Sequence, residues 1–296
     1  MTAILLVALS LPCVYIAPAG DGRAALEAAG ISRVCTDADL AQRDALPTPG
    51  TAPRAAVASP TRAPWIVANG WRFMRRPGSK YVYDVPAGKA ALAAAEAFAY
   101  GADAALKIDR ADAQPLADML KFLDALPTLD FPDVADFAVV DDGSAITGEV
   151  MNLLARRNLL FDVVQAPAPR FAINVRIGSP DYPREKAADP SAFALEIRRR
   201  LTDEARALRV YGSEVVICRL TAGAGRARLH LLNYGGREIE GLRIRVRGVY
   251  GDGEARVAGA GRLALQDRSV AAGATEFSLP RLTTYAVVDL RAAASR

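Results

Sequence analysis

Apolar positions alternate between helical and extended spacing from residue 86 to residue 220. Four apolar residues between Leu116 and Leu123 share one helical face, whereas Phe137–Val140 is a short apolar run typical of a buried strand. Strands and helices that alternate at these lengths predict an α/β domain, an open and mostly parallel sheet with flanking helices. We expect helices over 88–100, 116–123, 148–158 and 189–208, and strands over 104–108, 137–140, 161–164, 171–177 and 214–220.

The pattern changes after Leu220, where helical periodicity ends. Short segments of alternating apolar and polar residues follow, separated by turns that contain glycine. This spacing predicts that residues 221–296 form an all-β domain, a C-terminal antiparallel β-sandwich. The expected strands cover 226–234, 242–249, 255–257, 262–265, 276–279 and 285–290.

The N-terminal residues 1–19 resemble a secretory signal peptide. Thr2–Leu11 is apolar, and Ala17-Pro18-Ala19 fits the small-residue pattern of a cleavage site. Cleavage after Ala19 predicts a secreted or periplasmic protein. The alternative is a buried strand over 4–9 that leads into a helix over 22–29.

Residues 20–85 form an N-terminal segment, and its last part, Trp65–Val85, is the most aromatic stretch of the chain. Pro77-Gly78 is a turn signal between two aromatic runs, so we expect a hairpin with strands near 71–76 and 80–84.

The composition of the 296-residue chain is that of a globular protein, with 51% hydrophobic and 24% charged residues. A net charge of +4 is too small for a dedicated nucleic-acid binder. The apolar run at the N-terminus is shorter than the roughly 20 residues that span a membrane. Three cysteines and one histidine exclude zinc-finger and histidine-rich metal sites, and we expect no cofactor.

Cleavage after Ala19 would leave two cysteines, Cys35 and Cys218. They lie far apart in the sequence, so we expect two separate buried thiols, with pairing in an oxidising compartment as the alternative.

Two segments resemble domains of known proteins. Asp136–Ser144, the following helix and Phe161–Val164 resemble the flavodoxin-like, class I glutamine-amidotransferase-like domains that accompany bacterial glycosidases. The segments 228–248 and 277–290 resemble the C-terminal β-sandwich of the same enzymes. Together the resemblance covers roughly residues 86–296 and implies a carbohydrate context.

The amidotransferase-like segment departs from its family at the catalytic position. An active amidotransferase needs a cysteine on a tight strand-to-helix turn and a histidine to activate it. The corresponding turn here, Asp141–Ser144, has no cysteine, and His230 lies within a predicted sandwich strand. A complete eight-stranded barrel would need about 250 residues, more than precede the sandwich.

One candidate binding site follows the strand 137–140. Asp141, Asp142 and Ser144 lie where that strand ends and a helix begins, at the sheet edge where ligands of α/β folds bind. Asn174 and Arg176, on the polar side of the segment 171–177, are further binding candidates. A neutral sugar is the expected ligand, and the alternative is a helix-capping loop with Ser144 or Thr147 as the cap.

A second candidate site combines aromatic and charged residues. Aromatic rings stack on sugars, and carboxylates accept hydrogen bonds from sugar hydroxyls, so the group could bind a carbohydrate. The alternative for the aromatic residues is the domain core. The candidates are Trp65, Trp71, Tyr81, Tyr83, Asp84, Lys107 and Asp109.

Arginines alternate with apolar residues in 226–233 and 242–249. If these two strands pair, their basic residues decorate one sheet face, and His230 points outward with them. Such a face could bind an anionic polysaccharide or an acidic partner. The alternative is a solvated surface.

These patterns predict a secreted, non-catalytic accessory or assembly protein of carbohydrate metabolism. Its partners would be a carbohydrate or another protein, and it could form a homo-oligomer. One alternative is a glycoside hydrolase with paired carboxylates, for which Asp84, Asp109, Asp141 and Asp142 are the catalytic candidates. The other is a sugar-binding protein.

Overall fold

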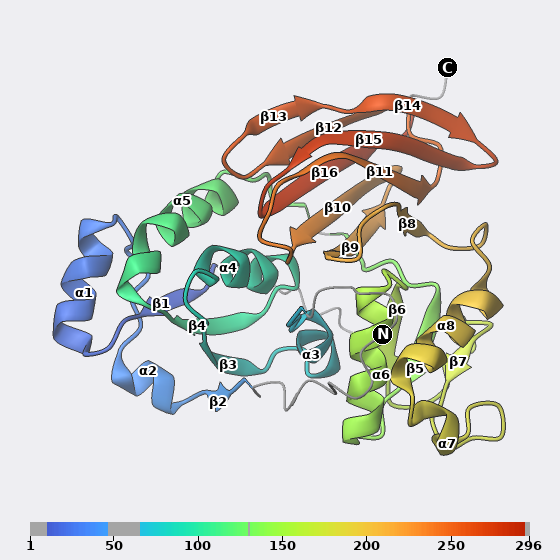
Figure 1. Cartoon of the computed structure of the whole chain (residues 1–296), viewed down its shortest axis with the longest axis horizontal. Helices are drawn as coiled ribbons and strands as arrows, with labels where there is room; N and C mark the ends of the chain where they lie inside the picture. Colours follow the sequence, from blue (N-terminus) through green and yellow to red (C-terminus); the bar gives the residue numbers. More distant parts are fainter. Residues whose placement is uncertain (1–10, 47–65, 130, 294–296) are drawn as a thin grey trace. The chain divides into compact units, whose positions relative to one another are not determined.

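The computed structural model describes residues 11–46, 66–129 and 131–293 (Figure 1). The chain divides into two compact units, unit 1 over Met1–Asp130 and unit 2 over Phe131–Arg296. The structure contains parallel sheets with flanking helices and then antiparallel sheets, which confirms the predicted fold class. The division differs from the predicted limits after residues 85 and 220, because the α/β region is split between the units.

Unit 1 is built on a four-stranded parallel sheet in the order β1-β4-β3-β2. Its core includes Val14 of β1, Leu106 of β4 and Leu116 of α5, all fully buried. The elements are β1 (Cys13–Tyr15), α1 (Ala19–Ala28), α2 (Asp37–Ala41), β2 (Asp44–Ala45), α3 (Gly70–Arg75), β3 (Lys80–Asp84), α4 (Ala90–Ala99), β4 (Asp103–Lys107), the 3-10 helix η2 (Arg110–Asp112) and α5 (Ala113–Asp124).

The predicted aromatic hairpin is replaced by a helix and a strand. Residues 70–75 form α3, and only 80–84 form a strand, which pairs in parallel with β4 rather than with its sequence neighbour. The physical reason lies 26 residues away, because the buried Glu96 carboxylate accepts hydrogen bonds from the backbone N–H groups of Asn69 and Gly70 at 2.6 and 3.0 Å. These bonds satisfy two donors at the start of α3.

The first strand bears on the signal-peptide prediction. Residues 1–10 lie outside the described residues, but Cys13–Tyr15 forms an edge strand of the sheet and pairs with β4. Cys13 is also joined to Cys35 by a disulfide, with a Cα–Cα distance of 5.4 Å. Cleavage after Ala19 would remove this strand and the Cys13 half of the disulfide. The expectation of two separate thiols at Cys35 and Cys218 is corrected: Cys35 is paired with Cys13, and Cys218 is free and buried.

Unit 2 begins with a three-stranded parallel sheet in the order β6-β5-β7. Helix α8 starts as predicted, because Asp189 caps it and Pro190 occupies the first turn, but it ends at Leu201 rather than near residue 208. Of the predicted strand 171–177, only Asn174–Val175 is extended. The elements are β5 (Phe137–Val140), α6 (Ala145–Arg156), β6 (Phe161–Val164), β7 (Asn174–Val175), α7 (Arg184–Ala187) and α8 (Pro190–Leu201).

Two antiparallel sheets form the rest of unit 2 and enclose a shared apolar core. One has the strand order β13-β12-β16-β10-β9 and the other β14-β15-β11-β8. Leu229, Ile244 and Phe277 are fully buried between them. The strands are β8 (Leu208–Val210), β9 (Val216–Gly223), β10 (Arg226–Asn233), β11 (Ile239–Arg247), β12 (Asp252–Val257), β13 (Gly261–Ala264), β14 (Gln266–Ala271), β15 (Ala274–Leu282) and β16 (Tyr285–Arg291).

The sandwich therefore starts upstream of its predicted limit. The segment predicted to end the α/β sheet is β9, which pairs antiparallel with β10. Strand β8 pairs with β11 in the other sheet.

The predicted arginine-rich face does not form, because β10 and β11 belong to different sheets. In β10, Arg228 and His230 are 1% and 2% exposed, so His230 is buried rather than outward-facing. In β11, Arg245 is buried and Arg247 is exposed. The prediction assumed one solvated face, whereas β10 is buried on both faces.

Within the described ranges, no helix combines the length and apolar character needed to cross a membrane. The same residues contain no group of three or more His, Cys, Asp or Glu side chains arranged to hold a metal ion.

Candidate functional site

A pocket of about 410 Å³ lies in unit 1 at the carboxyl ends of three neighbouring strands. The strands β1, β4 and β3 are parallel, so the residues that follow them meet at one edge of the sheet. The volume is within the range of about 300–1,000 Å³ that is typical of small-molecule sites. The lining residues are Ile16, Ala17, Asp84, Val85, Ala87, Lys107, Ile108, Asp109 and Arg110.

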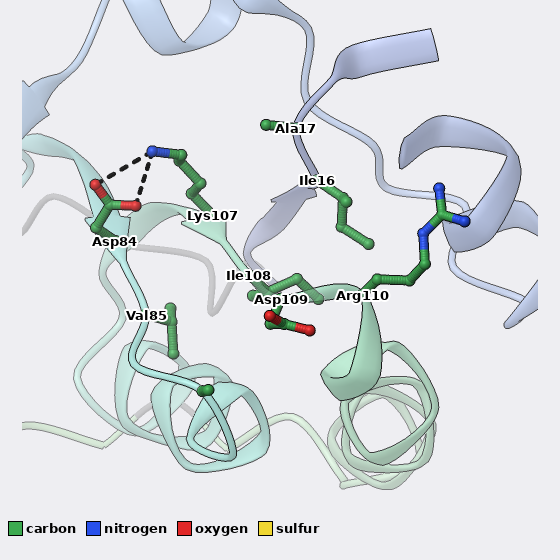
Figure 2. A pocket seen from close by; sticks show the side chains of 9 residues that line it. Ile16, Ala17, Asp84, Val85, Lys107, Ile108, Asp109 and Arg110 are labelled. Carbon is green, nitrogen blue, oxygen red and sulfur yellow. Dashed lines mark hydrogen bonds and ion pairs between the residues drawn. The ribbon is translucent and has the colours of Figure 1, made fainter. Parts of the chain in front are cut away.

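An ion pair joins the ends of β3 and β4 at this pocket. Asp84 and Lys107 are direct neighbours in the strand register, and the Lys107 ammonium lies 2.9 Å from Asp84 Oδ1 and 3.3 Å from Oδ2. The Asp84 side chain is 77% exposed, so the pair is accessible to a ligand (Figure 2). Both groups can bond to hydroxyls, the carboxylate as acceptor and the ammonium as donor.

Asp109 and Arg110 follow β4 and begin η2. The Asp109 carboxylate accepts a hydrogen bond from the backbone N–H of Ala111 at 2.8 Å and caps this helix. Arg110 donates from Nη2 to the backbone oxygen of Asp21 in α1 at 3.2 Å. Each side chain is exposed and keeps further hydrogen-bonding capacity toward the pocket.

Apolar side chains form the other part of the lining. Ile16, Val85 and Ile108 are buried, each directly after a strand. With two acidic and two basic side chains, the lining carries no net formal charge. A pocket with apolar surface, balanced charge and both donors and acceptors suits a neutral polyhydroxylated molecule better than an ion.

The predicted aromatic residues that the structure describes, Trp71, Tyr81 and Tyr83, are not among those lining this pocket. Trp71 and Tyr81 are 8% and 4% exposed, and the Tyr81 ring packs against Phe73 with a centroid distance of 5.8 Å. Tyr83 is half-buried; burial raises its pKa, and the Glu96 charge adds to the rise. Trp65 lies outside the described residues. In the described part, Trp71 and Tyr81 therefore belong to the core of unit 1.

The first predicted site, the loop after β5, is a helix-capping loop. Ser144 caps α6, and its hydroxyl accepts a hydrogen bond from the backbone N–H of Thr147 at 3.3 Å. The Asp141 carboxylate accepts a hydrogen bond from the backbone N–H of Gly143 at 3.0 Å. The Asp142 carboxylate accepts one from the backbone N–H of Ser144 at 2.9 Å.

Asp142 is also bonded to Arg184, at 3.2 Å. Partial burial alone would raise the pKa of Asp142, but hydrogen bonds from Ser144 and Thr147 and the Arg184 charge outweigh it and lower the pKa to about 2. This carboxylate is therefore ionised at neutral pH and is unsuited to act as a general acid.

The remaining predicted binding residues lie on β7 and directly after it. The Asn174 side chain accepts from the backbone N–H of Ala168 at 2.7 Å and donates to the backbone oxygen of Phe171 at 2.9 Å. These bonds fold residues 168–174 into a turn, which explains why β7 is short. Arg176 is exposed.

The thiol and imidazole of unit 2 lie on opposite faces of one sheet. Cys218 is paired in register with Leu231 and shares its core-facing side, whereas His230 points to the other face. His230 Nδ1 lies 2.6 Å from the Tyr285 hydroxyl, and burial lowers the pKa of His230 well below its usual value. Burial raises the pKa of the Cys218 thiol. The described residues thus bring no thiolate and histidine base together.

Sequence reasoning identified three charged residues of the unit 1 pocket, Asp84, Lys107 and Asp109, but missed Ile16, Ala17 and Arg110. Ile16 and Ala17 follow β1, a strand that lies within the predicted signal peptide. The apolar run before Ala17 was the available signal for a strand.

No family model matches the sequence, and no curated protein matches it. Among solved structures, the chain is similar to alpha-L-fucosidase isoenzyme 2 from Paenibacillus thiaminolyticus, with a TM-score of 0.54 and 10% identity over 76% of this chain. It is also similar to a GH42 beta-galactosidase from G. stearothermophilus, with a TM-score of 0.44 and 9% identity over 71% of this chain. The chain spans 62% and 53% of the lengths of these two chains.

The fucosidase similarity supports the fold, a parallel α/β region followed by a β-sandwich. The predicted α/β region followed by a C-terminal β-sandwich agrees with the fold of this glycosidase. The amidotransferase-like domain stays a prediction.

Proposed function

We propose that this protein is a non-catalytic accessory protein of carbohydrate metabolism that binds a neutral sugar in the unit 1 pocket. The observation that carries the proposal is the joint placement of Asp84, Lys107 and Asp109 at the carboxyl ends of β3 and β4. Their carboxylates and ammonium group can bond to sugar hydroxyls, and the buried apolar side chains beside them can contact the C–H face of a ring.

The arrangement of the two pocket carboxylates favours binding over hydrolysis. A glycosidase needs one protonated and one ionised carboxyl group on either side of the scissile bond. Here Asp84 is paired with the Lys107 ammonium, and Asp109 accepts a backbone N–H. Each carboxylate therefore already accepts a bond from a donor of the protein, an arrangement that suits a fixed acceptor for sugar hydroxyls.

The fold similarity to an alpha-L-fucosidase supports descent from a sugar-processing architecture. The absence of a thiol–imidazole pair in the described residues removes amidotransferase chemistry from the proposal. Assembly with another protein or with a second copy of the chain is part of the proposed accessory role. Light scattering would measure the molar mass of the protein in solution and so its oligomeric state.

A secreted or periplasmic location is also part of the proposal. Disulfides persist in oxidising compartments, and the Cys13–Cys35 bond supports export. A leader compatible with this bond would be cleaved before Cys13 rather than after Ala19. Mass spectrometry of the exported chain would locate the cleavage site.

A glycoside hydrolase is the second candidate, because Asp84 and Asp109 line the same pocket. Candidate catalysis by Asp141 or Asp142 has less support, since both cap backbone groups near the start of α6.

Calorimetric titration with a panel of neutral monosaccharides, together with turnover of aryl glycosides, tests both candidates. We expect binding without turnover, and Asp84→Asn should weaken binding by about tenfold, as for the loss of one charge-assisted hydrogen bond. Asp118→Asn, at an exposed position on α5, is the matched control and should bind like the unmodified protein. Turnover abolished by Asp84→Asn would instead establish the hydrolase.

A further inference from the structure

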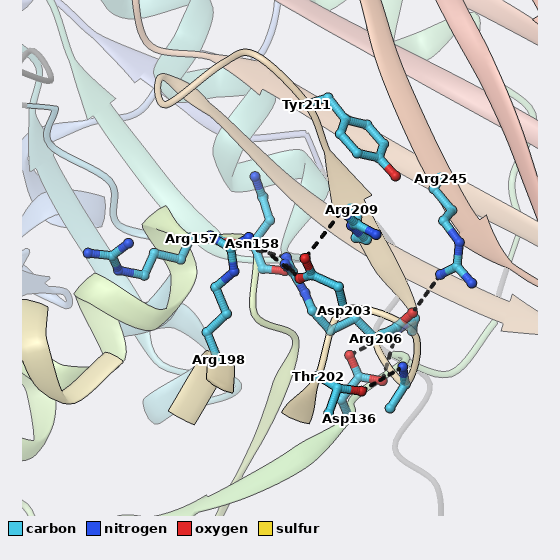
Figure 3. A network of polar contacts seen from close by, with 12 residues as sticks. Asp136, Arg157, Asn158, Arg198, Thr202, Asp203, Arg206, Arg209, Tyr211 and Arg245 are labelled. Carbon is cyan, nitrogen blue, oxygen red and sulfur yellow. Dashed lines mark hydrogen bonds and ion pairs between the residues drawn. The ribbon is translucent and has the colours of Figure 1, made fainter. Parts of the chain in front are cut away.

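Five arginines gather in unit 2 around the loop that joins α8 to β8 (Figure 3). Arg157 directly follows α6 as its C-cap residue, Arg198 lies in the last turn of α8, and Arg206 is in the loop. The other two are Arg209 of β8 and Arg245 of β11. The side chain at the centre of the group is Asp203.

Asp203 is shared among three guanidinium groups. Its carboxylate lies 3.5 Å from Arg198, 3.3 Å from Arg206 and 3.2 Å from Arg209. Charge-assisted hydrogen bonds between guanidinium and carboxylate groups are usually about 2.7–2.9 Å long. All three contacts are longer than that. The single carboxylate of Asp203 is therefore shared by three guanidinium groups and forms a close ion pair with none of them.

Two of the arginines are incompletely bonded within the described residues. Arg206 is 4% exposed, and its Nη2 donates to the backbone oxygens of Arg157 and Asn158, both at 3.2 Å. The Nε atoms of Arg157 and Arg206 are buried and have no hydrogen-bond partner. Burial lowers the pKa of Arg206, and the charges of Arg198 and Arg209 lower it further, although Asp203 opposes the shift.

The other carboxylates near the group are bonded elsewhere. Both carboxylate oxygens of Asp136 accept a hydrogen bond from the backbone N–H of Ala207, each at 3.0 Å. The same carboxylate forms an ion pair with Arg247 at 3.4 Å. Glu276 is bonded to Arg243 at 3.0 Å and to the Tyr211 hydroxyl at 3.2 Å. Burial lowers the pKa of Arg157, whereas the negative charge of Glu214 raises it by electrostatic attraction. Positive charge is therefore in excess around Asp203.

We propose that Arg198 and Arg209, beside Asp203, bind a small oxyanion: a sulfate, phosphate or carboxylate group. The side chains of Arg198 and Arg209 are 42% and 25% exposed, so an anion can reach them from solvent. The planar guanidinium fork matches the geometry of these oxyanions. This site lies in unit 2 and is separate in its chemistry from the neutral-sugar pocket proposed for unit 1.

Calorimetric titration of the full chain with sodium sulfate and sodium phosphate tests the proposal, with sodium chloride at equal ionic strength as the reference. We expect saturable binding of at least one oxyanion that chloride does not reproduce. Arg198→Gln and Arg209→Gln should each weaken it by at least about tenfold. Arg199→Gln, an equal charge change at an exposed position on the same helix, should leave it unchanged.

Two further arms identify the source of the oxyanion. Glucuronate and glucose 6-sulfate, compared with glucose, report whether a sugar carries it, and tighter binding than the inorganic ions would assign the site to an acidic saccharide. Asp203→Asn removes the competing carboxylate and should tighten binding. Absence of saturable binding in both the unmodified protein and Asp203→Asn, or an equal loss in Arg199→Gln, would overturn the proposal.

Discussion

Arg228 and Asp289 lie directly opposite each other on β10 and β16 and form a buried, bidentate ion pair. Arg228 Nε is 2.7 Å from Asp289 Oδ1, and Nη2 is 2.8 Å from Oδ2. The side chains are only 1% and 8% exposed. A guanidinium removed from water to this extent needs its carboxylate, because an unpaired buried charge is costly.

Replacing Asp289 by Asn should therefore lower the free energy of unfolding by about 3–5 kcal/mol. Urea denaturation followed by circular dichroism measures the change. Glu27→Gln, which breaks the exposed Arg23–Glu27 pair of α1, is the control and should cost less than about 0.5 kcal/mol. Similar small effects in both variants would contradict the importance assigned to the buried pair.

Reduction of the Cys13–Cys35 disulfide should destabilise unit 1. The bond closes a loop with a sequence separation of 22 residues, for which chain entropy predicts a loss of about 3 kcal/mol. Thermal unfolding of Cys13→Ser measures the loss. Thiol titration of the denatured, unreduced protein should detect Cys218 alone, and three reactive thiols would refute the pairing.

Asp142 makes the stability of unit 2 depend on pH in acid. Its pKa is lowered from 3.8 to about 2, so its contribution is present above pH 3.8 and disappears as the pH falls through about 2. Asp142→Asn should be less stable than the unmodified protein at pH 7, by less than about 1 kcal/mol because the side chain is partly exposed. The difference between the two should vanish near pH 2, and a difference independent of pH would exclude this origin.

Ser144 has a structural role at the start of α6. Ser144→Ala removes the cap on the Thr147 N–H and should cost about 1 kcal/mol in urea denaturation. Sugar binding measured by calorimetry should stay the same, because Ser144 is not part of the unit 1 pocket. If Ser144→Ala instead abolished sugar binding and left the free energy of unfolding unchanged, this loop would be part of the ligand-binding site.

Local patterns in the sequence predicted α4, α6, the start of α8 and the sandwich strands β10, β11, β12, β13, β15 and β16, but not β8, β9 and β14 as parts of the sandwich. Their signals are short-range: Asp189 before Pro190 starts α8, and alternating apolar residues mark strands β10 and β11. The candidate pocket was predicted in part for a similar reason, since Asp84 and Lys107 are the last residues of β3 and β4, near the strands expected over 80–84 and 104–108.

The errors arose where a distant residue decides the local structure. Helix α3 depends on Glu96, which no pattern within residues 71–76 reveals. The predicted cleavage after Ala19 removes Cys13, so the sequence pattern leaves Cys35 without this disulfide partner. His230 was predicted to face solvent, because alternation shows which residues share a face but not what covers that face.

The covalent link between Cys13 and Cys35 also governs what a protease can release. A single cut of the folded chain anywhere between these two cysteines, including the bond after Ala19, would leave the N-terminal fragment attached. The two pieces would migrate together in a non-reducing gel and separate only after reductant is added.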